Sequence, residues 1–161
     1  MKEEMPVTPA VRVLRAAKVD FRGCLYNYED KGGTAVSARE LGVAEHIVIK
    51  TLIMEDDQKR PLVVLMHGDR EVSTKTLARH LGVKFVSPCT PELANKYTGY
   101  LVGGISPFGT KRPLPVYMEG TIADLPKVYI NGGKRGFLVE ISTAALIRVL
   151  QPKAVKVAIG D

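Results

Sequence analysis

The chain has 161 residues, of which 45% are hydrophobic and 25% charged, and its formal net charge is +6. This length and composition suit one globular domain over residues 1–161, and no apolar run approaches the about 20 residues that cross a bilayer, which excludes a membrane-spanning helix. The positive charge permits a polyanionic partner without requiring one.

The first third of the chain predicts two helices on either side of a strand. The N-terminal stretch Met1–Pro6 is charged and has no apolar segment behind it, so we expect no secretory signal and a cytoplasmic location. The predicted elements are a helix that begins at Thr8-Pro9 and runs to Ala17, a strand from Phe21 to Tyr28, and, after the loop Lys31–Thr34, a short helix ending near Leu41–Gly42.

The middle of the chain predicts a hairpin followed by two short helices. The segments Ile47–Met54 and Pro61–Met66 are rich in β-branched and apolar residues and should pair with each other. After them we expect a helix capped by Ser73 or Thr74 and running through Leu81, a short strand Lys84–Val86, and a helix from Thr90-Pro91 through Tyr97.

The last third predicts strands and a final helix. These are strands at Leu114–Met118, Lys127–Ile130 and Phe137–Ile141, a helical turn near Ile122–Leu125, a helix Thr143–Leu150 capped by Ser142, and a β-prone segment Val155–Ile159. This order of elements, with no repeat or linker, favours a single α+β domain with a central mixed, largely antiparallel sheet flanked by helices.

The cysteines and histidines do not suggest chemistry of their own. Cys24 and Cys89 cannot build a disulfide framework, and neither lies beside a histidine that would activate a thiol. His46, His67 and His80 have no cysteine or carboxylate at the spacing of metal ligands. We therefore expect no disulfide, no cysteine nucleophile, no metal and no cofactor.

Lys50 is unusual because it lies on the apolar face of a predicted strand. The period of two residues places it on the same face as Val48, Leu52 and Met54. An unpaired ammonium there costs several kcal/mol if fully desolvated, so it must reach solvent, a carboxylate or an anionic ligand. Lys50 either guards a sheet edge, or extends to solvent, or lines a pocket where it binds a phosphate or stabilises developing charge.

Two glycine-rich segments lie close to basic residues. The run Gly103–Gly109, which we call the glycine loop, contains three glycines and Pro107, so its main chain can approach a ligand closely. Lys111 and Arg112 follow it, and Asn131–Gly136 contains Lys134 and Arg135. Such clusters also mark ordinary turns, but glycines beside bases suit a phosphate or a terminal ribose.

These motifs together resemble the YbaK/EbsC family. The resemblance rests on Lys50-Thr51-Leu52 in a strand, on Thr98–Gly109 and on Gly132–Gly136, and it extends over nearly the whole chain. It implies an α+β fold and an aminoacyl-tRNA deacylase related to the editing domain of bacterial prolyl-tRNA synthetases. Such a protein acts in trans on mischarged tRNA, removing cysteine from tRNA(Pro) in one subgroup, and it can act with prolyl-tRNA synthetase.

The resemblance also implies residue roles. Lys50 is the essential strand lysine, which binds the terminal ribose or phosphate, and a role as general base is disfavoured because it needs a strongly depressed pKa. Backbone N–H groups of Gly103–Ile105 are candidate oxyanion donors. The implied substrate-binding residues are Tyr28 (or Tyr26, since the register is open), Thr51, Gly103, Gly104, Ile105, Ser106, Pro107, Phe108, Gly109, Asn131, Gly132, Gly133 and Leu138; the candidate tRNA contacts are Lys111, Arg112, Lys134 and Arg135.

Two departures leave the specificity open. Cysteine-specific relatives carry an aspartate, suited to the substrate's α-amine, where this chain has Leu138, and a serine where it has Asn131. In those relatives the thiol of the substrate attacks the ester, whereas an ordered water acts in relatives that remove alanine. The alternatives are therefore a deacylase for another small amino acid such as alanine, a non-catalytic module that binds aminoacyl-tRNA, and a dimerising domain.

Overall fold

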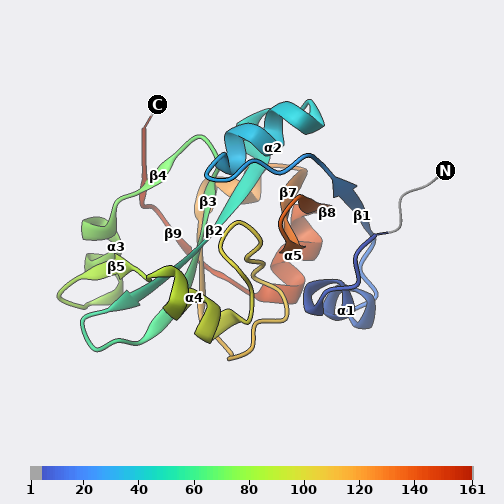
Figure 1. The fold of residues 1–161 in the computed structure, drawn as a ribbon. Coiled ribbons are helices and arrows are strands. Elements are labelled where there is room, and N and C mark those ends of the chain that lie inside the picture. Colours follow the sequence, from blue (N-terminus) through green and yellow to red (C-terminus); the bar gives the residue numbers. More distant parts are fainter. Residues whose placement is uncertain (1–4, 161) are drawn as a thin grey trace.

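One mixed sheet of eight strands forms the centre of the computed structural model, which describes residues 5–160 (Figure 1). The strand order is β1-β8-β7-β2-β3-β6-β9, and β5 pairs with β2 outside this path. A separate pair joins β10 to β4. The strands are β1 (Phe21–Leu25), β2 (Val48–Asp56), β3 (Pro61–His67), β4 (Glu71–Val72), β5 (Val86–Pro88), β6 (Val116–Glu119), β7 (Lys127–Lys134), β8 (Phe137–Ser142), β9 (Lys153–Val155) and β10 (Ala158–Ile159).

The predicted mixed sheet is confirmed, and so is its central hairpin. β2 and β3 pair antiparallel from Ile49 opposite His67 to Glu55 opposite Pro61. β1, β7 and β8 form a second antiparallel group, in which β8 lies between the other two. Parallel pairings of β2 with β7 and of β3 with β6 join the parts into one sheet.

The helices begin where the capping residues predict. Thr8, Ser73, Thr90 and Ser142 each accept a hydrogen bond from a backbone N–H in the first turn of the following helix, which satisfies a donor that the helix leaves free. The helices are α1 (Pro9–Ala16), α2 (Gly33–Leu41), α3 (Thr74–Leu81), α4 (Pro91–Thr98) and α5 (Thr143–Leu150), with short 3-10 turns η1 (Glu45–Ile47) and η2 (Gly120–Asp124).

Several β segments differ from the prediction because pairing partners set their limits. β7 continues past Ile130 to Lys134, which pairs with Phe137 on β8. β1 ends at Leu25, opposite the first residue of β8, so Tyr28 lies in a loop. β5 starts at Val86, because its partner on β2 is the segment Met54–Asp56. The expected C-terminal strand is divided into β9 and β10, which pair with different neighbours. β4 was not predicted, since two residues carry no periodicity.

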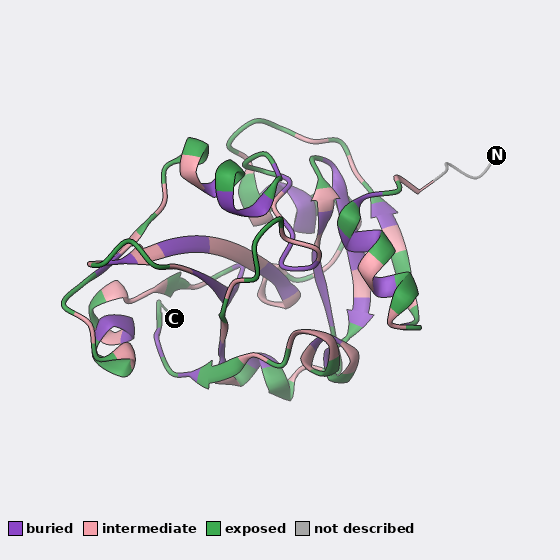
Figure 2. Cartoon of the chain, turned by 90° about the horizontal axis from the view of Figure 1, so that it is seen from below, coloured by how far each residue is buried: buried purple, intermediate pink, exposed green. Residues whose placement is uncertain are grey.

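The sheet is buried on both faces. One face packs against α1, α4 and α5 around the fully buried side chains of Leu14, Phe108 and Leu146. The other face packs against α3 through Leu77 and Met66. Figure 2 shows the buried residues concentrated in the strands and on the inner faces of the helices. A rigid sheet therefore supports any site at the strand ends.

Glu140 ties the second antiparallel group together. Its carboxylate accepts hydrogen bonds from Arg22 on β1 at 2.5 Å and from the hydroxyl of Tyr129 on β7 at 2.7 Å, and Lys127 donates at 3.3 Å. The Arg22 and Tyr129 hydrogen bonds lower the pKa of Glu140 to about 2. A carboxylate whose pKa falls on folding stabilises the fold above its unfolded pKa near 4.5, and loses that contribution as the pH falls toward 2.

We therefore predict that Glu140→Gln lowers the free energy of unfolding at pH 7 by about 1–2 kcal/mol, because hydrogen bonds to a charged acceptor are weakened. The difference between the variant and the wild type should shrink between pH 4.5 and pH 2. Urea unfolding at several pH values measures both. A difference that is constant down to pH 2 would assign the loss to packing rather than to charge.

Candidate functional site

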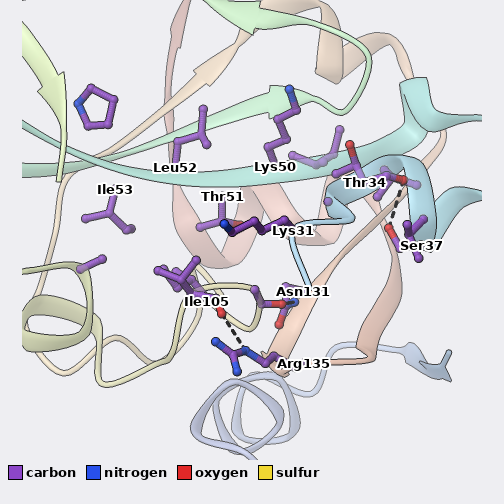
Figure 3. Close-up of a pocket in the computed structure, with 18 of the residues that line it drawn as sticks. Lys31, Thr34, Ser37, Lys50, Thr51, Leu52, Ile53, Ile105, Asn131 and Arg135 are labelled. Carbon is purple, nitrogen blue, oxygen red and sulfur yellow. Dashed lines mark hydrogen bonds between the residues drawn. The ribbon is translucent and has the colours of Figure 1, made fainter. Parts of the chain in front are cut away.

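A cleft of about 600 Å³ opens at the middle of β2. β3 covers one edge of β2 from Ile49 to Glu55. On the other edge β7 pairs with Val48 and Ile49 and β5 pairs with Met54–Asp56, so residues 50–53 have no strand partner there within the described part of the chain. The gap is lined by β2 itself, the start of α2, the glycine loop and the end of β7 (Figure 3).

Lys50 lines this cleft and extends on the same side of β2 as Leu52, as the strand period predicts (Figure 3). Its Nζ donates to the carbonyl oxygen of Arg70 at 2.7 Å and to Oε1 of Glu71 at 3.1 Å. The Lys50 side chain is 19% exposed, whereas that of Glu71 is 75% exposed. An ion pair with so exposed a carboxylate is weak, so an anionic ligand in the cleft can displace Glu71.

Thr51 points to the opposite side of β2, toward Ile105 of the glycine loop (Figure 3). Its Oγ1 is buried and makes no hydrogen bond to any residue between 5 and 160. A buried hydroxyl without a partner costs about 1–3 kcal/mol. A ligand that bonds to this oxygen would recover that free energy, so Thr51 is the polar group of the cleft best placed to gain from occupancy.

The glycine loop is anchored by contacts that require its glycines. Gly103 has φ +90°, and a Cβ there would lie 2.4 Å from the hydroxyl of Tyr28. A Cβ on Gly104 would lie 2.8 Å from the backbone nitrogen of Arg135, which cannot move aside as a flexible side chain can. The loop therefore lies against Tyr28 on one side and the turn between β7 and β8 on the other.

Part of the glycine loop faces the cleft and part faces the core. Gly103 and Ile105 line the cleft. Ser106 and Phe108 are buried, and the Ser106 hydroxyl accepts a hydrogen bond from the N–H of Phe108. The N–H of Gly104 donates to Leu101 at 2.8 Å, so it is engaged in a turn and is not a free oxyanion donor. The predicted substrate-binding residues that lie outside the cleft lining are Gly104, Ser106, Pro107, Phe108, Gly109, Gly132 and Gly133.

Both candidate tyrosines line the cleft, but Tyr28 is the one that contacts the glycine loop. The guanidinium of Arg135 lies 5.5 Å from the centre of the Tyr28 ring, a cation–π arrangement, and its Nε donates to the carbonyl oxygen of Val102 at 2.8 Å. Tyr28 and Arg135 thus hold the near side of the loop in place.

Asn131 and Leu138 lie opposite each other on β7 and β8, and both line the cleft. The amide nitrogen of Asn131 donates to the carbonyl oxygen of Gly103 at 3.0 Å, and its oxygen accepts from the N–H of Gly133 at 2.7 Å. Leu138 is buried among apolar side chains that include Val48. Because Leu138 is uncharged, it cannot form an ion pair with the ammonium group of a substrate.

The four predicted tRNA contacts fall into two places. Lys134 and Arg135 are exposed at the turn between β7 and β8, beside the glycine loop, and Arg135 also lines the cleft. Lys111 and Arg112 are exposed at the end of α4 and do not line the cleft; the Arg112 guanidinium lies 5.0 Å from the centre of the Tyr97 ring. The first pair is therefore adjacent to the candidate site and the second is not part of its lining.

Several lining residues were not predicted. Glu71 and the carbonyl of Arg70 reach Lys50 because β10 pairs with β4, a contact between residues far apart in sequence. Lys31 enters from the turn before α2 and Thr34 from the start of α2. Cys89 also lines the cleft, and burial raises its pKa to about 11, so its thiol stays protonated at neutral pH.

Within residues 5–160, no group of three or more His, Cys, Asp or Glu side chains is arranged to hold a metal ion. No helix in that range is long and apolar enough to cross a membrane. The cleft thus combines charged side chains at its rim, among them Lys50, with one unpartnered hydroxyl, a main-chain loop and apolar walls, which suits a ligand that is polar at one end and small and apolar at the other.

Comparison with known proteins places this chain in a family. Residues 29–149 match the model of the aminoacyl-tRNA editing domain. The chain is 28% identical over 147 residues to EbsC of Enterococcus faecalis, which carries the provisional name Cys-tRNA(Pro)/Cys-tRNA(Cys) deacylase; the match covers 91% of this chain and 90% of EbsC. It is 32% identical over 95 residues to the proline–tRNA ligase of Levilactobacillus brevis, covering 58% of this chain but 16% of the ligase.

The fold is also found among solved structures. A hypothetical protein of known crystal structure superposes with a TM-score of 0.86 at 23% identity, covering 94% of this chain and 100% of that one. The family predicted from Lys50, the glycine loop and the Gly132–Gly136 segment is thus confirmed over most of the chain. The protein belongs to the aminoacyl-tRNA editing domain family.

Proposed function

We propose that this aminoacyl-tRNA deacylase removes cysteine from tRNA(Pro) and that it acts in trans, as one domain spanning residues 1–161. Membership of the editing family establishes the class of enzyme. The observation that carries the proposal is the cleft itself, because its lining includes Lys50, Thr51 and the glycine loop. The name given to EbsC supports cysteine as the first substrate to test.

The chemistry needs few side chains because an aminoacyl ester is already activated. Lys50 binds the terminal ribose or phosphate after Glu71 moves away, which fixes the ester over the free edge of β2. Backbone N–H groups of Gly103 and Ile105 are the remaining candidates for the oxyanion, since that of Gly104 is engaged. No step requires a metal or a cofactor.

The nucleophile for a cysteinyl ester is the substrate's own thiol. Its sulfur forms a bond to the ester carbon, the carbon–oxygen bond to the ribose breaks, and the thiol proton passes to the ribose oxygen. Water then opens the resulting thiolactone to free cysteine. For an alanyl ester a water held in the cleft attacks directly. Leu138 gives the α-ammonium of either substrate no counter-charge where a cysteine-specific site has an aspartate, so the alanyl ester is the second substrate to test.

The proposed macromolecular partners follow from the substrate. The similarity to part of a proline–tRNA ligase supports an association with prolyl-tRNA synthetase, in which the synthetase would hand over mischarged tRNA. Lys134 and Arg135, with Lys111 and Arg112 further away, are the proposed acceptor-stem contacts. A cytoplasmic location, where charged tRNA is present, is part of the same proposal.

Multiple-turnover deacylation tests the proposal with Cys-tRNA(Pro), Ala-tRNA(Pro), Pro-tRNA(Pro), Cys-tRNA(Cys) and, as the thiol-free analogue, Ser-tRNA(Pro). We expect release of more than one cysteine per protein molecule and retention of serine and proline. Selective release of alanine from Ala-tRNA(Pro) would show that the protein is specific for alanine and uses the water-dependent reaction. If the protein instead protects every ester from hydrolysis, at one ester per protein molecule, it is a non-catalytic binding module and not an enzyme.

A further inference from the structure

A second hollow of about 380 Å³ lies beside the cleft, between α3 and the segment 83–86 that leads into β5. Thr74 at the start of α3 lines both the cleft and this hollow, so the two are adjacent. Figure 1 shows α3 and β5 side by side, at the end of the molecule opposite α1. We call this hollow the α3 groove.

Three cations line the α3 groove. Lys75 and Arg79 are on α3 and Lys84 is on the facing segment, and all three side chains are exposed. None of them forms an ion pair within residues 5–160. The nearby carboxylate of Asp57 accepts a hydrogen bond from the backbone N–H of Lys84 at 3.1 Å and does not pair with its ammonium. The lining itself therefore carries three positive charges and no carboxylate. Such a surface attracts phosphate groups.

The groove also presents an aromatic ring to solvent. Phe85 lines it and is 55% exposed, whereas the next residue, Val86, is buried in the core. An exposed ring flanked by cations is the arrangement with which proteins hold unpaired nucleotides, because a base stacks on the ring while the cations bind the flanking phosphates. A paired base offers no free face to such a ring.

We propose that the α3 groove binds the unpaired nucleotides next to the aminoacylated end of the substrate tRNA, with a base on Phe85 and phosphates at Lys75, Arg79 and Lys84. This inference rests on the proposed function, because the ester must occupy the adjacent cleft for the preceding nucleotides to reach the groove. It assigns the unpaired nucleotides to the β4–α3 side of the cleft, the side toward which Lys50 extends, as an alternative to a path past Arg135 on the glycine-loop side.

Binding of uncharged tRNA(Pro) tests the groove. The probes are the full-length transcript and a transcript that lacks the four unpaired 3′-terminal nucleotides. For K75A/R79A/K84A we expect the Kd of the full transcript to rise at least fivefold and the slope of log K against log salt to fall in magnitude by about 2. The truncated transcript should bind this variant and the wild type equally. The matched control is R15A/K153A/K156A, which removes three exposed cations outside both hollows and should leave the Kd within twofold.

Variants of Phe85 distinguish the contribution of base stacking from that of charge. Phe85→Ala should raise the Kd of the full transcript about fivefold, and Phe85→Trp should keep it at the wild-type value, because every base has a face that stacks on an aromatic ring. Circular dichroism and thermal unfolding establish that each variant is folded.

Four results would contradict binding of RNA by the groove. The Kd of K75A/R79A/K84A could rise no more than that of the control variant, or it could rise equally for the truncated transcript. Phe85→Ala could have no effect, or the wild type could bind neither RNA. Because these transcripts carry no amino acid, the binding measurement does not depend on ester cleavage. A wild type that binds through the groove but hydrolyses no ester would refute the deacylase alone. A wild type that hydrolyses esters with the groove variants unaffected would refute the groove alone.

Discussion

Replacing Lys50 by methionine is expected to lower kcat/KM for aminoacyl-tRNA deacylation at least 100-fold, with little change in thermal stability. Methionine keeps an unbranched apolar stem in place of the four methylenes of the lysine but removes the ammonium that lines the cleft. Loss of the charged donor that positions the ester lets the ester shift, and a displacement of about 1 Å can cost a factor of 10². Steady-state deacylation of the preferred ester, with thermal unfolding measured in parallel, tests the expectation.

The neighbouring carboxylate provides the control for this prediction. Glu71→Gln removes the negative partner of Lys50 but leaves the ammonium, and the hydrogen bond to the carbonyl of Arg70 remains available. If Glu71 must move away before the substrate binds, this variant keeps its kcat and its KM falls. If the kcat/KM of Lys50→Met lies within threefold of the wild-type value, Lys50 has no role in deacylation and either guards a sheet edge or extends to solvent.

The position of Lys50 was predictable from the sequence, whereas its partners were not. The strand period places Lys50 on one face, and the structure has it there (Figure 3). Its carboxylate partner lies on β4, which has two residues and pairs with β10 near the C-terminus. Neither propensity nor periodicity reports a contact over such a separation in sequence, because it depends on how the whole chain folds.

The same distinction applies to the glycine loop. Its glycines predict a main chain that approaches something closely, just as Thr8, Thr90 and Ser142 predict where α1, α4 and α5 begin. The sequence does not show that the close neighbours of the loop include Tyr28 and the backbone of Arg135. Nor does it show that the N–H of Gly104 is taken by Leu101, since a turn hydrogen bond depends on the φ and ψ angles that the loop adopts in its packed state.

Substituting Gly103 by alanine is expected to reduce kcat/KM between 10- and 100-fold. The residue has φ +90°, which L side chains rarely adopt, and the new methyl would lie 2.4 Å from the Tyr28 hydroxyl and 3.0 Å from the ring carbon that carries it. Movement of Tyr28 would disturb the loop as well, because Arg135 lies over its ring and donates to the carbonyl oxygen of Val102. The loop must therefore shift, and displacement of reacting groups by about 1 Å can cost a factor of 10².

Two further variants separate this displacement from general backbone strain. Gly42→Ala introduces the same kind of strain at φ +69°, but no atom lies within 4 Å of the added methyl, so stability should fall by about 1 kcal/mol while activity is kept. Adding Tyr28→Phe to Gly103→Ala removes the closest clashing atom and should restore part of the lost kcat/KM. If Gly103→Ala retained full activity while losing as much stability as Gly42→Ala, the position of the glycine loop would not matter to ester cleavage, and the oxyanion role of its main chain would be wrong.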